Sequence, residues 1–402
     1  MNKLLLVLTF SFITIPSFAL DLRGSAGIET RYFTSDQEFQ SSVFIEPEAY
    51  WQNEDASNSI TFKPFVRADE LDSERSHLDI REFFYQYASD NLELRAGINK
   101  IYWGVTESQH LVDVINQTDS LEGFDGEDKL GQPMLQLTFI QDWGVVDAFI
   151  LPYFREKAFP GKDGHFNFSS QQIINNQTVR YSAHFNDAIY ESSAEEKHVD
   201  ATLRYSHSFG DWDFGLSYFD GTQRDPFILL SGMDNQKTEL IFTPYYAQMQ
   251  QLGMDLQATL GSWLWKMEVI SRETRSHHFT AVTAGFEYTF YGVSEAGADL
   301  GLLAEINKND RNEIAMSPAE HDLFIGGRYT WNDEQSSDLL FGISQDLDNP
   351  KSYSGKLEAN RRLGNSYKLG VEAWFFNSDD QSDPIYAIRD EDFMQLSLEY
   401  YF

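Results

Sequence analysis

Short segments in which apolar and polar residues alternate run along almost the whole chain, and they constrain its fold more than any other feature. The segment MQLSLEYYF shows the pattern: Met394, Leu396, Leu398, Tyr400 and Phe402 alternate with Gln, Ser, Glu and Tyr. Side chains of a β-strand point to opposite faces in turn, so such a segment is apolar on one face and polar on the other. A soluble sheet can use the same pattern, so the number and length of the segments decide the fold.

Eighteen such segments can be counted, most of about nine to thirteen residues, which is the length of a tilted strand that crosses a membrane. We expect strands at 21–33, 42–51, 59–68, 77–88, 92–104, 133–141, 144–154, 197–208, 212–220, 245–260, 263–273, 279–290, 298–307, 321–331, 338–346, 353–363, 367–377 and 391–402.

The segments between these strands are of two kinds. Short turns alternate with longer acidic loops, at 69–76, 105–132, 155–196, 221–244, 308–320 and 378–390. Outer-membrane barrels have short periplasmic turns and long external loops. We therefore predict an all-β fold: a transmembrane antiparallel β-barrel of about 18 strands, within a range of about 16–20. Its last strand pairs with its first, because an open sheet edge cannot lie in lipid.

The first nineteen residues have the form of a secretory signal peptide. Lys3 precedes an apolar run from 4 to 15, and small residues follow at Ser17 and Ala19. The run is too short to span a membrane and Pro16 interrupts its end, which disfavours an anchor. We expect residues 20–402 to form one barrel domain, without a separate N-terminal plug domain, in the outer membrane of a Gram-negative bacterium.

The composition limits the possible partners. Aromatic residues make up 15% of the chain, which suits the aromatic girdles of a membrane barrel. The net charge of −33 excludes nucleic acid as a partner, and the absence of cysteine excludes disulfides. Tyr400 and Phe402 resemble the C-terminal signature of Gram-negative outer-membrane proteins. The resemblance implies recognition by the outer-membrane insertion machinery, with lipid and lipopolysaccharide as surroundings.

Two segments resemble an uncharacterised family of porin-like outer-membrane barrels. In that family a Gly-x-x-x-Ile-x-Trp-Gly strand end precedes an Asp-Val-Ile-Asn-Pro-x-Asp loop. The matching residues in 97–119 are Gly97, Ile101, Trp103, Gly104, Asp113, Val114, Ile115, Asn116 and Asp119, with Gln117 in place of the proline. Residues 250–270 resemble a second family segment, which carries Gly253, Asp255, Lys266 and Glu268. The resemblance implies an 18-strand-like barrel of a kind sometimes associated with envelope transport systems, and it implies no substrate.

The 105–132 loop is the main candidate site. It carries seven acidic residues and one Lys, and it also contains the apolar residues Leu111, Val112, Val114 and Ile115. An acidic loop in water is one interpretation. The apolar residues favour a loop packed against the inner wall, where Asp113, Asp119 and Glu122 are left free to face a solute path. The predicted pore-lining or constriction residues are Arg81, Glu93, Arg95, Asp113, Asp119, Glu122, Asp255, Lys266 and Glu268. Salt bridges that simply fill the lumen are the alternative.

Other chemistry has little support. The DGED stretch at 125–128 lacks the spacing of a calcium loop, and the nine histidines show no metal-binding spacing. No residue arrangement indicates a catalytic site, so we predict no enzyme activity, no cofactor and no metal. Three functions remain open: a passive channel for small hydrophilic solutes that prefers cations, an export or lipid-handling barrel that works with an inner-membrane transporter, and a non-conducting structural or adhesion barrel. The sequence does not specify the oligomeric state.

Overall fold

The computed structural model of the chain describes residues 20–123, 125–167, 170–174, 177–234, 239–275, 277–311 and 319–402, with the backbone alone given for 170–174 and 177–180. The predicted signal peptide at 1–19 lies outside the described residues. Among the described residues, no helix combines the length and the apolar character that are needed to cross a bilayer.

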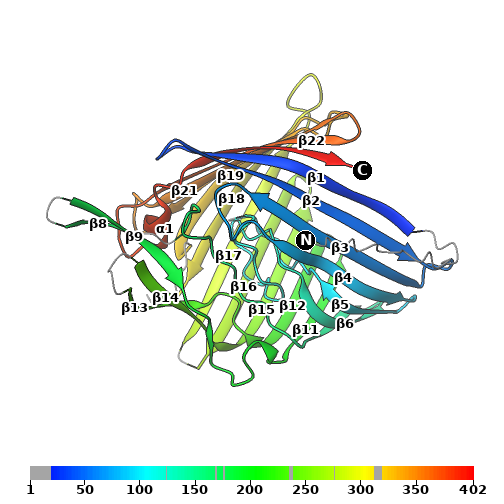
Figure 1. Cartoon of the computed structure of the whole chain (residues 1–402). Helices are drawn as coiled ribbons and strands as arrows, with labels where there is room; N and C mark the ends of the chain where they lie inside the picture. Colours follow the sequence, from blue (N-terminus) through cyan, green and yellow to red (C-terminus); the bar gives the residue numbers. More distant parts are fainter. Residues whose placement is uncertain are drawn as a thin grey trace, which may run out of the picture.

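The main body is a closed antiparallel barrel of 18 strands (Figure 1), and each predicted strand overlaps one of them. The predicted fold class is therefore confirmed. The barrel strands are β1 (Leu20–Phe33), β2 (Glu38–Gln52), β3 (Asn58–Asp69), β4 (Leu78–Ala88), β5 (Leu92–Asn99), β6 (Gln132–Gln141), β7 (Gly144–Leu151), β11 (Asp200–Phe209), β12 (Trp212–Thr222), β15 (Gln248–Leu260), β16 (Trp263–Thr274), β17 (His278–Phe290), β18 (Asp299–Asn309), β19 (His321–Thr330), β20 (Asp338–Asp346), β21 (Tyr353–Leu363), β22 (Tyr367–Asn377) and β23 (Phe393–Tyr401).

The barrel closes where β1 meets β23. Their register runs from Ser25 opposite Tyr401 to Phe33 opposite Phe393. The N–H of Gly24 donates to the carbonyl of Phe402 at 3.0 Å, and the N–H of Phe402 donates back at 3.1 Å. β1 pairs with β2 on its other side, so both of its edges are hydrogen-bonded, as a strand in lipid requires.

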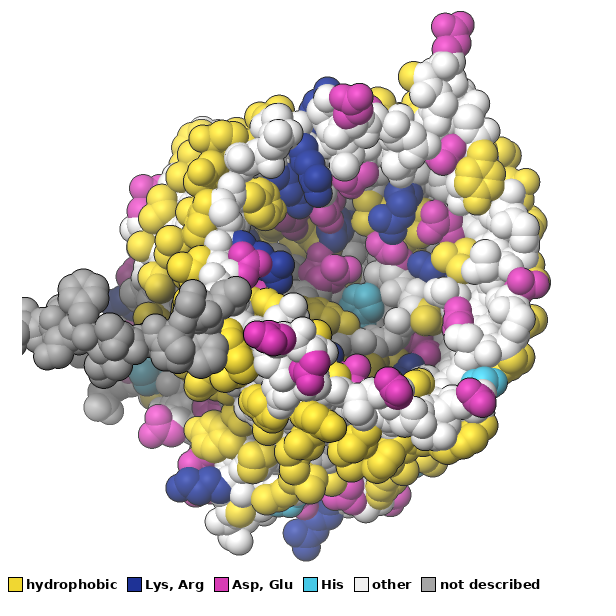
Figure 2. Space-filling model, turned by 90° about the vertical axis from the view of Figure 1, so that its right-hand side faces the viewer, with side chains coloured by type: hydrophobic (Ala, Val, Ile, Leu, Met, Phe, Trp, Pro, Cys, Tyr) yellow, Lys and Arg dark blue, Asp and Glu magenta, His cyan; other side chains and the backbone are white. Residues whose placement is uncertain are grey.

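Alternation along each strand separates an apolar outer wall from a polar lumen. On β3, Ile60, Phe62 and Val66 are exposed on the outside, whereas Thr61 and Arg67 are buried inside. Figure 2 views the barrel from one end: hydrophobic side chains cover the outer wall, and the hollow interior carries Lys, Arg, Asp and Glu. Tyr400 and Phe402 belong to the outer face, with ring centroids 6.2 Å apart.

A second sheet corrects the prediction for two of the loops. The segments predicted as loops at 155–196 and 221–244 contain β8 (Ser170–Ile174), β9 (Gln177–Phe185), β10 (Ile189–Tyr190), β13 (Phe227–Met233) and β14 (Glu239–Tyr246). These strands pair in a five-stranded sheet at the long-loop end of the barrel (Figure 1). Neighbouring long loops at one end can pair with each other, and their pairing leaves no signal in the spacing of the barrel strands.

The fifth strand is shorter than predicted. Its pairing with β6 ends at Asn99 rather than at residue 104, and the chain returns to the wall at Gln132. Residues 100–131 between these points are called the plug segment below.

Candidate functional site

The plug segment lies inside the barrel, where it is the cyan trace of Figure 1. Its hydrogen bonds and ion pairs reach inward side chains on opposite parts of the wall. The wall residues that contact it are Arg31 on β1, Arg67 on β3, Arg81 on β4, Gln251 on β15, Glu268 on β16, Glu305 on β18, Arg328 on β19 and Lys356 on β21.

Apolar side chains anchor one part of the plug segment. Val112, Val114 and Ile115 are buried, and they form one cluster with inward side chains of β6, β7, β12, β15, β16 and β17. Burying an aliphatic side chain of this size stabilises a structure by about 1.5–3 kcal/mol. These residues therefore pack the segment against the inner wall, as their apolar character in an otherwise acidic loop predicted.

Two carboxylates of the wall bind backbone N–H groups of the plug segment. Glu268 is completely buried. Its Oε1 accepts hydrogen bonds from the N–H of Val105 at 2.7 Å and from the N–H and hydroxyl of Thr106 at 3.0 and 2.7 Å. Its Oε2 accepts from the N–H of Val112 at 3.1 Å. Charge-assisted hydrogen bonds of this kind offset the cost of burying the carboxylate.

Glu305 repeats the arrangement on the neighbouring part of the wall. Its carboxylate accepts from the N–H of Glu107 at 3.0 Å and from the N–H of Ser108 at 2.8 Å. The chain approaches Glu268 closely at Gly104, whose φ is +110°, and a Cβ there would lie 2.6 Å from the Oε1 of Glu268. Gly104 is thus the residue that permits this contact.

Cationic side chains hold the other end of the plug segment. The guanidinium of Arg67 donates to both carboxylate oxygens of Glu122, at 2.9 and 2.5 Å, and Arg81 donates to Asp119 at 2.5 Å. Lys356 pairs with Asp125 at 2.6 Å. Burial opposes ionisation of Glu122, but Arg67, Arg75 and Arg81 outweigh it and lower the pKa of Glu122 below its ordinary value.

The residues of the DVINQTD stretch fix the base of the plug segment. The Oδ1 of Asn116 accepts from the N–H of Ile101 at 2.9 Å, and its Nδ2 donates to the carbonyls of Asn99 and Leu130, both at 2.9 Å. Gln117, which replaces the proline of the resembled pattern, is buried and donates to the carbonyl of Arg224 at 2.8 Å. The stretch therefore links the start of the plug segment, near Asn99 and Ile101, to its end at Leu130 by hydrogen bonds.

The sequence prediction for three acidic residues needs correction. Asp113, Asp119 and Glu122 are not free to face a solute path: Asp119 pairs with Arg81, Glu122 with Arg67 and Asp113 with Lys129. The side chains of all three are at most 8% exposed. A buried carboxylate without such a partner would lose its hydration and gain nothing in exchange. The paired arrangement is therefore lower in free energy than one in which the carboxylates face the lumen alone.

The other predicted residues divide into two groups. Lys266 lies 3.8 Å from Glu107 of the plug segment, and Asp255 forms two hydrogen bonds with Arg204, whose guanidinium lies 5.1 Å from the ring centre of Trp103. Glu93 and Arg95 stand apart. They lie 3.6 Å from each other, and Arg95 also donates to Gln86 on the wall. The structure thus brings Arg81, Lys266 and Glu268 to the plug segment, links Asp255 to it through Arg204, and pairs Arg95 elsewhere.

Sequence reasoning missed two arginines that hold the plug segment. Arg75, between β3 and β4, donates to the carbonyl of Leu121 at 2.8 Å and to Glu29 at 2.5 Å. Arg224 follows β12 and donates to the carbonyls of Val114 and Ile115 at 3.1 and 3.0 Å. Both lie in irregular segments, where alternation cannot assign an inward direction.

A cavity of about 220 Å³ lies at the surface of the plug segment. Its lining includes Tyr102, Trp103, Thr106, His110, Asp113 and Lys129. Aromatic rings, a carboxylate and an ammonium group therefore meet at one place in the lumen.

No model of a known protein family matches the chain, and no curated protein matches it. Solved structures do resemble it. OccK11 (OpdR) of Pseudomonas aeruginosa has a TM-score of 0.53 at 9% identity over 95% of each chain. A BenF-like porin from Pseudomonas fluorescens has a TM-score of 0.52 at 8% identity, over 96% of this chain and 98% of that one. OpdQ of Pseudomonas aeruginosa has a TM-score of 0.50 at 10% identity, over 96% and 99%. At such low identity the likeness establishes the fold, which is the barrel of outer-membrane porins.

Proposed function

We propose that the chain is a porin-like channel of the Gram-negative outer membrane, through which small hydrophilic solutes pass. The observation that carries the proposal is a hollow, charged lumen inside a closed apolar wall of porin fold. A protein that only anchored a surface structure would have little use for a lumen lined with charges. The surroundings that follow from this location are outer-membrane lipid and lipopolysaccharide, and the proposal involves no catalysed reaction.

The plug segment is the proposed constriction. It is held from several sides of the lumen, so a solute has to pass beside it. The cavity that contains Trp103 and Lys129 is the proposed place where solutes pause. Charged and aromatic groups in one cavity suit small polar molecules rather than apolar ones.

A preference for cations is part of the proposal. The net charge of −33 produces a negative potential at the mouths of the barrel. Within the plug segment, Glu127 is exposed, so it supplies negative charge that the buried Asp113, Asp119 and Glu122 do not. Screening limits such a potential to about 8–10 Å at physiological ionic strength, so the preference should weaken as salt rises.

The test is electrical recording of the purified chain in planar bilayers. We expect discrete conductance steps, and in a KCl gradient a reversal potential of the sign set by K⁺. The variant Glu127→Gln should lower the cation preference, and Asp55→Asn, in the turn between β2 and β3, is the matched control. An anion-selective reversal potential would refute the preference. Absence of conductance, both in the native chain and after removal of the plug segment, would refute the channel and favour a structural barrel.

The firm attachment of the plug segment favours a second candidate, an export or lipid-handling barrel that a partner opens. Ion pairs hold the segment at Arg67, Arg81 and Lys356, and hydrogen bonds hold it at Glu268. Such a barrel would rest closed until an inner-membrane transporter engaged it. A native chain that is electrically silent, together with a plug-deleted chain that conducts, would support this second function over passive diffusion.

A further inference from the structure

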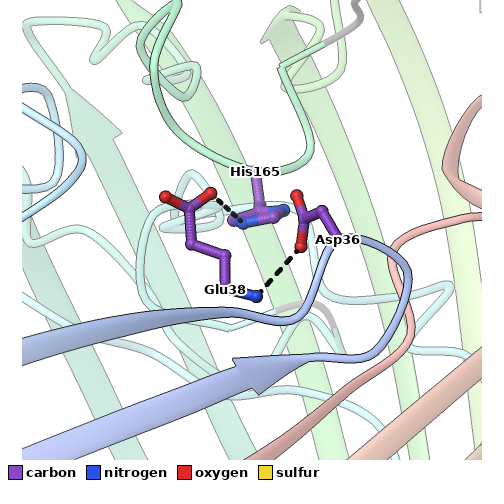
Figure 3. Close-up of side chains that lie close together, drawn as sticks. All are labelled: Asp36, Glu38 and His165. Atoms are coloured by element: carbon purple, nitrogen blue, oxygen red, sulfur yellow. Dashed lines mark hydrogen bonds and ion pairs between the residues drawn. The ribbon is translucent and has the colours of Figure 1, made fainter.

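A second group of ionisable side chains lies apart from the plug segment, at the long-loop end of the barrel. Asp36 lies in the turn between β1 and β2, Glu38 is the first residue of β2, and His165 comes from the segment after β7 (Figure 3). One possible ligand atom from each residue lies within 4.8 Å of the other two. Three side chains that are distant in the sequence thus converge on one point.

The imidazole of His165 is held in a defined orientation. Its ring stacks on Phe33, with centroids 3.3 Å apart and planes 5° apart, and its side chain is only 9% exposed. Its Nδ1 lies 2.7 Å from the Oε2 of Glu391. An ionised carboxylate only accepts hydrogen bonds, so this contact places a proton on Nδ1 and leaves the lone pair of a neutral imidazole on Nε2.

That Nε2 faces Glu38. It lies 3.7 Å from the Oε2 of Glu38, and among the described residues it makes no hydrogen bond. An imidazole whose one nitrogen binds a carboxylate and whose other nitrogen faces a further carboxylate has the arrangement of many metal-bound histidines. The orientation of His165 is therefore the one that a metal ligand needs.

The charges around His165 are not balanced. Within the described part of the chain, no Lys or Arg forms an ion pair with Asp36, Glu38 or Glu391. Three carboxylates therefore share one imidazole. Such a concentration of negative charge around a largely buried ring nitrogen attracts a cation.

The comparable group inside the lumen lacks this property. His77, Asp119 and Glu122 also bring ligand atoms together. There, however, Arg81 occupies Asp119 and Arg67 occupies Glu122, so guanidinium groups already supply the positive charge. A metal ion would have to displace them against their repulsion, so this group carries no proposal.

We propose that Asp36, Glu38 and His165 bind a divalent transition-metal ion of the Zn²⁺ type, with Glu391 as the positioning residue for the imidazole. One imidazole and two carboxylates, with water in the remaining position, form a set that Zn²⁺ accepts. The imidazole disfavours Ca²⁺ and Mg²⁺, which prefer oxygen ligands alone. The bound ion joins the β1–β2 turn to the segment after β7, and so fixes an external loop over the rim. The proposal departs from the expectation of no metal, which rested on sequence spacing alone.

The test uses the full chain without an affinity tag, purified in detergent and treated with a chelator. Titration calorimetry with Zn²⁺ should show one site, and Co²⁺ should report imidazole ligation through its visible absorption. We expect Glu38→Gln and His165→Ala each to weaken binding at least tenfold. Glu391→Ala should weaken it about tenfold, since it removes only the hydrogen bond that orients the imidazole. Asp55→Asn should leave binding unchanged.

The folding of each variant is checked by its heat-modifiable migration, and Glu38→Gln keeps the side-chain shape if His165→Ala does not fold. The chain has nine histidines, so binding elsewhere is the main alternative. Zn²⁺ affinity that is unchanged in Glu38→Gln and Glu391→Ala would overturn the proposal, as would the absence of binding to the native chain. Neither result depends on whether the barrel conducts.

Discussion

The two sides of the lumen hold the plug segment in different ways. On β16 and β18, Glu268 and Glu305 accept hydrogen bonds mainly from backbone N–H groups of residues 105–112. On β3 and β4, Arg67 and Arg81 bind carboxylate side chains of residues 119–122. The first contact depends on the shape of the segment and the second on its charges. One half of the segment can therefore be released without the other.

Removal of the plug segment tests both attachments at once and should have the largest effect. We expect a chain in which a short Gly-Ser linker replaces residues 108–128 to conduct several times more current per channel than the native chain. The physical reason is that the segment occupies the lumen between opposite walls. Single-channel recording is the measurement. A conductance equal to the native value would place the solute path elsewhere and make the constriction proposal wrong.

Loss of the charge-based attachment should have the next largest effect. Arg81→Ala leaves Asp119 buried without its partner, and breaking a buried pair in this way costs about 3–5 kcal/mol. We expect faster amide hydrogen exchange at residues 119–125, with little change at 105–112, together with noisier and larger conductance steps. Arg95→Ala is the matched control, because its ion pair with Glu93 is more exposed. Equal loss of protection in both halves would show that they are one unit.

Weakening of the shape-based attachment should have a smaller effect, and it should affect residues 105–112 instead of 119–125. In Glu268→Gln, a carbonyl oxygen at the Oε1 position keeps the contacts with Val105 and Thr106, whereas the new amide group meets the N–H of Val112. One unsatisfied buried donor costs about 1–3 kcal/mol. Hydrogen exchange should therefore quicken around 105–112 and not at 119–125, and Glu268→Ala should extend the same pattern. Unchanged exchange at 105–112 would contradict the assigned role of Glu268.

Acid should loosen the charge-based half gradually. The pKa of Glu122 is lowered in the folded chain, so the stability that it contributes is complete above the ordinary pKa of about 4.5 and disappears as the pH falls through the lowered value. Conductance should therefore rise reversibly below about pH 4. Glu122→Gln cannot titrate, so it should show a flatter profile and a higher conductance at pH 7. An identical acid response in both proteins would assign the effect to other groups.

The wall of the barrel could be predicted because its signal is local. Alternation located all eighteen strands, since each strand needs one face for lipid and one for the lumen, whatever its neighbours are. The five-stranded outer sheet could not be predicted in this way. β9 and β14 pair in parallel across a long stretch of sequence, and nothing in either segment specifies the other.

The candidate site shows the same division. The sequence predicts that the apolar residues of the plug segment pack inward, and alternation along the strands predicts that Glu268 and Arg81 point into the lumen. The pairing of Asp119 with Arg81 does not, because it depends on how the segment folds back. The position of His165 beside Glu38 is equally non-local: it needs the long loop after β7 to return to the β1–β2 turn.

The seam between β1 and β23 has a consequence for the order of folding. Its register joins residues 25–33 to residues 393–401, so the closing ladder links parts of the chain with the greatest possible separation. Contacts of high sequence separation form slowly, because the intervening chain has to lose its freedom before they are made. Until the seam closes, the edges of β1 and β23 both carry unpaired backbone groups and can pair with another chain instead. Barrel closure is therefore in kinetic competition with association between unfinished barrels, and whatever shields these two edges during insertion decides which process wins.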